Sequence, residues 1–284
     1  MTQNPRLRVV VFAVLALLLA CGVTTIFYTL VAPASFTLLI AGLDARPGEG
    51  VQARTDAVLL VNVRPRRAEV AVLSIPRDVF LRAPNYGLQR VNTINLLGEL
   101  ESAGRGMPLL KEAIEASLEL RIDRTLRLDF QGFVALIDAL GGVEVDVPRL
   151  LVDRAFPTID YGTKVVSFEP GPQTLSGEQA LIYARMRNVD DDYGRAARQQ
   201  QVVRGLAARL ANPLNWGTAW SVFQASVESD LTLGEALILA PAILLNAGRH
   251  ESLVMDRSFI RPGARGAEPD LEALKPFLDQ HFRE

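Results

Sequence analysis

The sequence predicts an α/β protein, in which an α-β-α sandwich with a central mixed sheet follows an N-terminal transmembrane helix. Two observations predict the sandwich: short aliphatic runs alternate with longer segments of helical periodicity, and no repeat or change of composition divides the chain. A third, an uncharged run near the N-terminus, predicts the membrane segment. The 284 residues, 49% of them hydrophobic and 22% charged, suffice for a buried core and exclude a disordered chain.

The N-terminal run predicts a single-pass membrane anchor. Residues 9–43 contain no charged side chain, and crossing a bilayer takes about 20 apolar residues. Because Arg6 and Arg8 precede the run, the positive-inside rule places the N-terminus in the cytoplasm. We therefore expect a cell-membrane protein with a cytoplasmic tail (residues 1–8), a transmembrane anchor (9–31) and an extracytoplasmic domain (35–284).

Two processed forms compete with this anchor. A cleavable signal peptide has an apolar core of about 7–15 residues, and the run here is longer. The residues that end at Cys21 loosely resemble a lipoprotein signal, but a chain lipidated there would begin with the apolar stretch 23–31, which fits a membrane span better. Cys21 is the only cysteine, which agrees with an oxidising compartment.

The first strands follow the anchor directly. Pro33 ends the helix, and residues 35–41 (SFTLLIA) have the pattern of a buried strand. Two further aliphatic segments, 55–63 and 69–74, predict strands joined as a hairpin by the turn at 64–67.

The middle of the chain alternates between helices and strands. Helical periodicity in two segments precedes a strand, a helix that ends on the C-capping pair Gly141-Gly142, and a strand that stops at Pro148. These elements are expected at residues 93–102, 108–120, 125–129, 130–140 and 143–147, in that order.

The last part of the chain predicts more helix than strand. Residues 150–173 are rich in Pro, Gly and aromatic side chains and predict irregular strands or hairpins. A helix starts at Ser176, and Asn212-Pro213 halts a long one over 192–211. The remaining elements are expected to be helices over 214–227 and 233–246, a strand over 253–255 and a final helix over 268–282.

The composition excludes several kinds of site. One cysteine rules out a CxxC redox pair and a cysteine-rich zinc site, and two histidines, His250 and His281, argue against a Ser-His-Asp triad or a multi-histidine metal centre. The net charge of −2 argues against a nucleic-acid partner bound through a broadly basic surface.

Four segments contain charged and polar residues that are candidates for a functional site. Three of them, the stretches 42–46 (GLDAR), 54–56 (RTD) and 74–78 (SIPRD), lie at ends of predicted strands, where ligands of open α/β sheets bind. The fourth spans 183–200 and places Arg195 on one face of a helix near its N-terminus, together with Arg198 and Gln199. Such helix ends favour anions, and arginines bind phosphate oxygens with two-point geometry. Arginines converging with two aspartates predict a phosphate site with a divalent cation.

The order and spacing of these segments resemble the LytR–CpsA–Psr (LCP) family of cell-wall enzymes. The matching motifs are GLDAR, RTDAVLL, SIPRD with its following RVNTIN, and GPQTLSGEQALIYARMRNVDDDYGRAARQQQ, and the resemblance runs from about Ser35 to the end of the chain. It implies a membrane-anchored phosphotransferase that moves a glycopolymer from a polyprenyl-pyrophosphate carrier onto peptidoglycan, usually onto a muramic acid hydroxyl. It also implies Mg²⁺, with Mn²⁺ as an alternative, and an apolar tunnel for the lipid beside the sheet.

Site residues are carried over from the family by position. Asp44 and Asp56 match the magnesium-associated aspartates. Asp192 matches an acidic residue near the metal and the reacting hydroxyl and is the candidate base ahead of Asp78, while Arg77 is expected to act on the reacting phosphate. The residues expected to bind the pyrophosphate are Arg77, Arg90, Arg185, Arg187, Arg195, Arg198 and Gln199. Two departures are Arg90 in place of a usual lysine and a slightly short loop over 188–194.

Other functions compete with this transfer. Water in place of the sugar hydroxyl would make the chain a polyprenyl-pyrophosphate phosphatase, and a non-catalytic lipid-binding or regulatory envelope protein is a third reading. The presence of the full Asp, Arg and Gln set argues against a non-catalytic binding protein. For the lipid, we expect an apolar tunnel between the sheet and the helices over residues 108–140 or 233–246, since both segments are rich in Leu, Ile and Ala.

Overall fold

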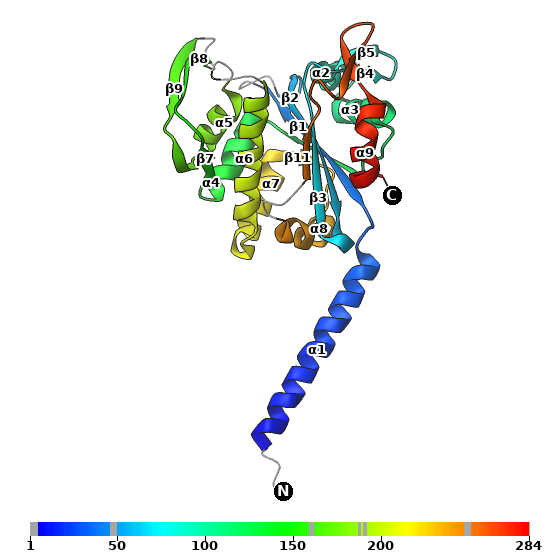
Figure 1. The fold of residues 1–284 in the computed structure, drawn as a ribbon, viewed down its shortest axis with the longest axis vertical. Helices are drawn as coiled ribbons and strands as arrows, with labels where there is room; N and C mark the ends of the chain where they lie inside the picture. Colours follow the sequence, from blue (N-terminus) through cyan, green and yellow to red (C-terminus); the bar gives the residue numbers. More distant parts are fainter. Residues whose placement is uncertain are drawn as a thin grey trace.

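The computed structural model describes residues 5–45, 50–158, 162–186, 189, 192–246 and 251–283. The first helix, α1 (Pro5–Val31), extends away from the rest of the chain (Figure 1) and ends two residues before Pro33, as predicted. Its described apolar side chains are largely exposed, Leu19 and Leu30 among them. Within the part of the chain that the structure describes, no helix combines the length and apolar character that a membrane crossing needs. The predicted span over 9–31 is therefore not supported by the structure.

A mixed sheet forms the centre of the domain, as predicted. Among the described residues it has six strands, in the order β11-β6-β1-β2-β3-β12. β1 runs antiparallel to β2 and parallel to β6, and β3 runs antiparallel to β2 and parallel to β12. The bounds are β1 (Phe36–Leu43), β2 (Thr55–Arg64), β3 (Glu69–Ile75), β6 (Arg124–Leu128), β11 (Val227–Ser229) and β12 (Glu251–Val254).

One face of the sheet carries the main hydrophobic core. Leu39, Leu60 and Leu73 point to this face and are fully buried against helices on the right of Figure 1. These helices are α2 (Val91–Glu101), α3 (Gly106–Leu118) and α9 (Leu271–His281). The helix α9 starts later than the predicted 268, because residues up to Pro269 form a strand and the Asp270 side chain accepts from the first amides of the helix.

The opposite face is covered by five described helices, which completes the α-β-α sandwich (Figure 1). They are α4 (Phe130–Ala139), α5 (Gly177–Arg185), α6 (Asp192–Leu210), α7 (Trp216–Ser226) and α8 (Leu233–Leu245). The start of α5 is fixed by a capping box, in which Ser176 and Gln179 each bond the other's backbone amide. Tyr183 on α5 is fully buried in a second core with β7 (Val143–Val147) and α6.

Several short strands lie outside the central sheet. The predicted strand β7 pairs with β10 (Gly171–Leu175) instead of joining that sheet, and β8 (Leu151–Pro157) pairs with β9 (Thr163–Phe168). Two further hairpins have no counterpart in the sequence prediction, because strands of three or four residues are too short to show alternation. They are formed by β4 (Phe80–Ala83) with β5 (Gly87–Arg90) and by β13 (Ile260–Pro262) with β14 (Ala267–Pro269). The turn between β2 and β3 is the short helix η1 (Pro65–Arg67).

The sheet face toward α4, α7 and α8 is apolar but incompletely covered. Cross-strand neighbours on this face keep part of their surface accessible, although they lie in the middle layer. They are Leu38, Ile40, Leu59, Val61, Leu126 and Leu128. The helix α3 does not border this face, since its apolar residues are buried in the main core. Residues 108–118 therefore do not contribute to the expected tunnel, and α4 and α8 remain as its candidate walls.

Candidate functional site

Three of the chemistry-bearing segments meet at one edge of the central sheet. Because β1 and β2 are antiparallel, as are β2 and β3, the end of β1, the start of β2 and the end of β3 lie side by side. A register shift opposite Leu43 accommodates the residues around Asp56, and the backbone amide of Asp44 donates to the carbonyl oxygen of Arg54 over 2.8 Å. The structure thus brings Asp44, Asp56 and Arg77 to one edge of the sheet, and the expectation that the two aspartates share a metal stays a prediction.

Arg77 forms the first ion pair of the site. Its Nη1 lies 3.2 Å from Oδ1 of Asp56, and its Nε lies 3.6 Å from Oδ2 of Asp78. The backbone of Arg77 is fixed by the start of α2, since the amide of Asn92 donates to the carbonyl oxygen of Arg77 over 3.2 Å. The side chains of Arg77 and Asp56 are 25% and 20% exposed, so both remain accessible to a ligand.

Arg185, the last residue of α5, forms the second ion pair. Its Nη2 lies 3.3 Å from Oδ1 of Asp44. Its guanidinium carbon lies 4.1 Å from the ring centroid of Phe130 and 5.8 Å from that of Phe156. An arginine held over an aromatic face is restricted in orientation. The last residue of α5 is therefore presented to the end of β1 in a defined geometry.

Arg198 is turned away from the surface and binds backbone. Its residue is only 3% exposed, its Nε donates to the carbonyl oxygen of Tyr183 over 2.9 Å, and its Nη2 donates to that of Met186 over 2.6 Å. These acceptors lie at the C-terminal end of α5, where helix carbonyls lack partners within the helix. Arg198 therefore fixes the end of α5 that carries Arg185, which the sequence motif did not reveal.

Arg195 and Gln199 are half-buried residues of α6, four positions apart and therefore on one face. The helix α6 begins at Asp192, whose side chain lies outside the described residues, as does all of Arg187. The roles expected for Asp192 and Arg187 remain predictions.

Arg90 lies at the rim. Its side chain is 57% exposed, its Nη1 is 3.8 Å from Oδ1 of Asp78, and its guanidinium carbon lies 5.7 Å from the ring centroid of Phe80. Asp78 therefore lies between Arg77 and Arg90.

Sequence reasoning missed the part played by Thr55 and Asn92. The Thr55 hydroxyl donates to the carbonyl oxygen of Val91 over 3.3 Å, joining β2 to the start of α2. Asn92 is 8% exposed, and its Oδ1 is the one buried side-chain oxygen or nitrogen without a hydrogen-bond partner among the described residues. The signal available in the sequence was Asn92 itself, a polar residue between Val91 and Ile94, which are both buried at the start of α2.

The donor set at this edge suits a hard divalent cation. Asp44 and Asp56 offer one carboxylate each, and Mg²⁺ typically takes one or two carboxylates together with substrate phosphates and water. No cluster of three or more metal-ligating side chains occurs among the residues that the structure describes. A fully protein-coordinated site is thus not formed there, whereas a site completed by phosphate oxygens is compatible with the two aspartates.

Comparisons with known proteins agree on one family. The model of the LytR_cpsA_psr family matches residues 29–251. The chain is 30% identical over 259 residues to the polyisoprenyl-teichoic acid–peptidoglycan teichoic acid transferase TagV of Bacillus subtilis, covering 87% of this chain and 64% of that protein. It is 32% identical over 201 residues to the transferase of the same description, TagU, of Oceanobacillus iheyensis, covering 69% and 59%. The chain thus spans less than two thirds of these relatives' lengths.

Solved structures give the same result. The crystal structure of B. subtilis TagV has a TM-score of 0.69 and 26% identity, covering 87% of this chain and 95% of that one. A structure of TagT bound to LIIa-WTA has a TM-score of 0.68 and 25% identity, covering 87% and 89%. The sandwich and its mixed sheet are therefore those of these transferases.

Proposed function

The chain is a member of the LytR_cpsA_psr family, and we propose that it transfers a glycopolymer from a polyprenyl-pyrophosphate carrier to peptidoglycan or another cell-envelope acceptor. One observation carries the proposal. Two aspartates at neighbouring strand ends each pair with an arginine. Asp56 of β2 pairs with Arg77 at the end of β3, and Asp44 after β1 pairs with Arg185 of α5. The relatives named as teichoic acid–peptidoglycan transferases support this class of reaction.

In this proposal the arginines bind the pyrophosphate. Phosphoryl transfer requires in-line positioning of the two reacting oxygens and neutralisation of charge on the phosphoryl oxygens. Arg77 and Arg185 are partly exposed, and each pairs with one of the two aspartates. Arg195 and Gln199 share a face of α6 and, with Arg187, complete the set that we assign to the phosphates. Arg90 is suited to a contact at the rim, and Arg198 acts by fixing the end of α5.

We assign Asp44 and Asp56 to Mg²⁺, with Mn²⁺ as an alternative. When bound, the ion would neutralise charge on the pyrophosphate. The chain's own contribution is to hold the two carboxylates on adjacent strands, each oriented by a guanidinium.

A base is needed for the acceptor hydroxyl. The hydroxyl oxygen forms a bond to the phosphorus of the glycopolymer phosphate, the bond from that phosphorus to the bridging oxygen breaks, and polyprenyl phosphate leaves. The hydroxyl proton must pass to a base. We retain Asp192 for this role, because Asp78 already lies beside the guanidinium groups of Arg77 and Arg90.

The incompletely covered sheet face supports a lipid carrier. Leu38 and Ile40 lie on β1, the strand that Asp44 directly follows, so an apolar surface leads to the predicted phosphate site. Burial of a polyprenyl chain contributes about 0.8 kcal/mol per CH₂, which favours such a surface over water. We also propose that residues 9–31 tether the domain to the membrane, on the basis of their uncharged sequence and the exposed apolar side chains of α1.

A transfer assay tests this function. Purified full-length chain is incubated with Mg²⁺, a polyprenyl-pyrophosphate-linked glycopolymer and peptidoglycan, and polymer bound to peptidoglycan is quantified. Asp56→Asn should reduce transfer at least about 100-fold, the usual loss when one contact to a developing charge is removed. The matched control is Asp146→Asn, an exposed aspartate of β7. Equal activity in both variants would refute the assigned site.

A further inference from the structure

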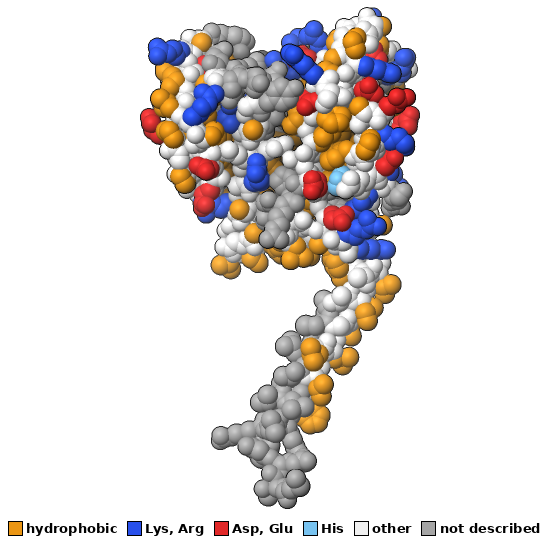
Figure 2. All heavy atoms as spheres, viewed as in Figure 1, with side chains coloured by type: hydrophobic (Ala, Val, Ile, Leu, Met, Phe, Trp, Pro, Cys, Tyr) orange, Lys and Arg blue, Asp and Glu red, His pale blue; other side chains and the backbone are white. Residues whose placement is uncertain are grey.

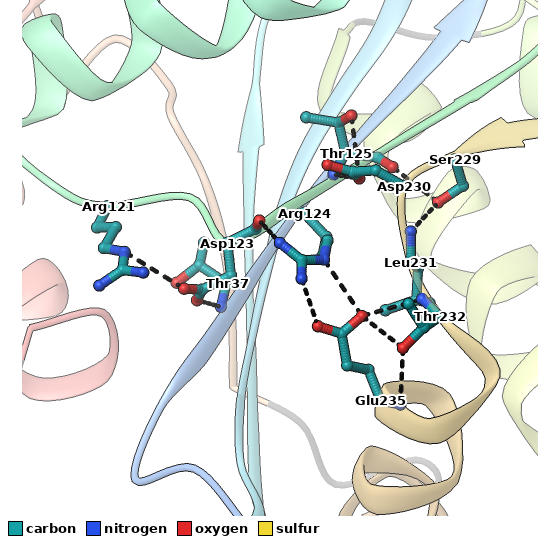
Figure 3. A network of polar contacts seen from close by, with 10 residues as sticks. All are labelled: Thr37, Arg121, Asp123, Arg124, Thr125, Ser229, Asp230, Leu231, Thr232 and Glu235. Atoms are coloured by element: carbon teal, nitrogen blue, oxygen red, sulfur yellow. Dashed lines mark hydrogen bonds and ion pairs between the residues drawn. The ribbon is translucent and has the colours of Figure 1, made fainter.

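The helix α8 is apolar on almost every side. Its sequence, LGEALILAPAILL, contains one charged residue, Glu235. That carboxylate is neutralised within the domain, since its Oε1 lies 2.7 Å from Nη2 of Arg124 and its Oε2 accepts from Thr232 (Figure 3). The rest of the helix therefore presents no charge to its surroundings.

Only one side of α8 is buried by the domain. Leu239 and Ala242 are 4% and 1% exposed and pack against Phe36 and Val63 of the sheet. On another side, Leu233, Leu237 and Leu245 are 46%, 50% and 73% exposed and, with Pro241, follow each other at intervals of four residues. A surface helix normally has a polar outer face, and one that is apolar all round is typical of a helix buried in a core or a membrane. We call the exposed residues 233, 237, 241 and 245 the leucine stripe.

The leucine stripe lies beside α1. The hydroxyl of Tyr28 in α1 donates to the carbonyl oxygen of Ile238 in α8 over 3.0 Å. Both helices lie at the base of the domain in Figure 1, and apolar side chains line that base in Figure 2. The helix that carries the stripe therefore adjoins the exposed apolar side chains of α1.

Arginines flank the stripe. A cavity of about 690 Å³ is lined by Arg64, Arg66, Arg67 and Arg283, with Asp279 as its acidic residue. Arg64 and Arg283 donate to backbone carbonyl oxygens, and Arg283 also pairs with Asp279, so Arg66 and Arg67 are the exposed basic side chains of this cavity. The Nε of Arg66 donates to the carbonyl oxygen of Ala32 over 2.8 Å, which places the cavity where α1 ends. Asn246, directly after α8, donates to the carbonyl oxygen of Ala68, next to Arg67. Figure 2 shows basic side chains gathered at this junction.

We propose that the leucine stripe and the arginine cavity form a membrane-contact surface, in which the leucines enter the boundary between headgroups and acyl chains and the exposed Arg66 and Arg67 bind anionic phospholipid headgroups. An apolar face flanked by basic residues is the pattern of interfacial helices. This proposal rests on the proposed membrane tether.

The surface would also set the distance of the site from the bilayer. Phe36 starts β1 and packs against Leu239 and Ala242 on the buried side of α8, and Asp44 follows the other end of the strand. Eight residues of strand, at about 3.3 Å each, place the predicted phosphate site roughly 25 Å from this contact with α8. The half-buried apolar sheet face lies along this distance, so a lipid chain could run from the membrane to the site without entering water.

Because α1 could hold the full-length chain on a vesicle by itself, the test measures depth instead of binding. Leu237→Cys is made in a Cys21→Ala background, labelled with an environment-sensitive fluorophore and reconstituted with phosphatidylcholine vesicles, with or without phosphatidylglycerol, that contain brominated acyl chains as quenchers. The matched control is Leu100→Cys, which labels a leucine of α2 that is 64% exposed. We expect strong quenching at position 237 and none at position 100.

Arg67→Glu tests the cavity. Its side chain is exposed, so the fold should persist. Loss of one arginine near an anionic surface should weaken headgroup binding about fivefold, and reversal of its charge by more, so quenching at position 237 should fall in phosphatidylglycerol vesicles only. Equal quenching at positions 237 and 100, or a chain that does not sediment with vesicles, would overturn the proposal.

A separate readout distinguishes this proposal from the proposed function. Transfer from a short-chain carrier analogue in detergent needs no bilayer, so Arg67→Glu should leave that rate unchanged. Quenching at position 237 in a chain without transfer activity would refute the proposed function and support the membrane-contact surface. Loss of detergent activity in Arg67→Glu would overturn the assignment of Arg67 to the membrane alone.

Discussion

Arg185 is held by contacts that a lysine could not reproduce. Its guanidinium lies against the ring of Phe130 and also reaches Asp44, and the planar group supplies paired donors to a phosphate. Arg185→Lys should lower kcat/KM by about 100- to 1,000-fold, by analogy with lost oxyanion contacts. Thermal unfolding of the variant should change little, and Arg154→Lys, at an exposed position of β8, should change neither property. Wild-type kinetics in Arg185→Lys would exclude it from the phosphate site.

The two aspartates should differ from the arginines in their response to metal. If Asp44 contributes a ligand to Mg²⁺, chelation should abolish transfer in the wild type and added Mg²⁺ should restore it. Asp44→Asn should shift the Mg²⁺ concentration that gives half-maximal activity upward by at least about tenfold, the lower range for weakened metal sites. A metal titration of the transfer rate measures this, and a rate independent of chelator would contradict the assignment.

At the residue scale, the sequence predicted which charged residues belong to the candidate site, but not which of them stay accessible and which bind the backbone. Order and spacing sufficed to place Asp44, Asp56 and Arg77 at one edge, because strand ends determine position. Arg198 belongs to the same helix motif as Arg195, yet it binds backbone carbonyls of α5. Helical spacing gives the face of a residue, but only the packing of α5 against α6 shows what that face meets.

At the element scale, the position of Arg185 depends on how closely α5 approaches α4. A Cβ on Gly177 would lie 2.3 Å from the backbone oxygen of Val134, with no flexible side chain to yield. Gly177→Ala should therefore destabilise the fold by about 1–3 kcal/mol, as overpacking does. Gly217→Ala is the control, since a Cβ there meets nothing within 4 Å and α7 should gain up to about 1 kcal/mol. Chemical denaturation measures both, and equal stability of the variants would show that α4 and α5 are less tightly packed.

A buried ion pair joins the elements behind the site. Nη1 of Arg127 on β6 lies 2.5 Å from Oε1 of Glu99 on α2, and both side chains are at most 3% exposed. Burial alone raises the pKa of Glu99, but hydrogen bonds from Arg127 and from the amides of Gly104 and Gly106 hold it below its ordinary value of 4.5. A carboxylate with a lowered pKa stabilises the fold above the unfolded pKa, and this stabilisation is lost as the pH falls.

Glu99→Gln should therefore cost about 1.5–3 kcal/mol at neutral pH, the usual worth of a hydrogen bond to a charged group, because Arg127 loses its buried carboxylate partner and keeps Glu228, which is 58% exposed. The difference in unfolding free energy between wild type and variant should shrink as the pH falls below about 4.5, the ordinary value for Glu99. Glu178→Gln, whose carboxylate is 72% exposed, provides the control. A difference that stays constant between pH 7 and pH 4 would mean that Glu99 is not the titrating group.

The longer elements were predictable, and the short ones were not. Strands β1, β2 and β3 are aliphatic runs that differ from the predicted ranges by at most two residues at either end. The hairpin of β4 and β5 escaped prediction, because its strands have four residues each and its turn depends on Asn85 and Gly87 in left-handed conformations. Local sequence cannot show such a turn without the tertiary contacts that stabilise it.

At the scale of the whole molecule, the proposed phosphate site and the proposed membrane-contact surface lie at opposite ends of one sheet. The aspartates and arginines lie where β1 ends, and the leucine stripe and arginine cavity lie where β1 begins. An apolar sheet face connects the two ends. This arrangement suits a substrate with a charged pyrophosphate at the end of a long apolar chain.

The fate of the two phosphates tests the central claim most directly. Wild-type chain is incubated with Mg²⁺, peptidoglycan and a carrier-linked glycopolymer, and the products are analysed by mass spectrometry after digestion of the peptidoglycan. We expect polyprenyl monophosphate in equal amount to a muropeptide that carries the polymer through a phosphodiester. Polyprenyl monophosphate accompanied only by free polymer phosphate would identify a phosphatase and contradict the transfer proposed for this protein.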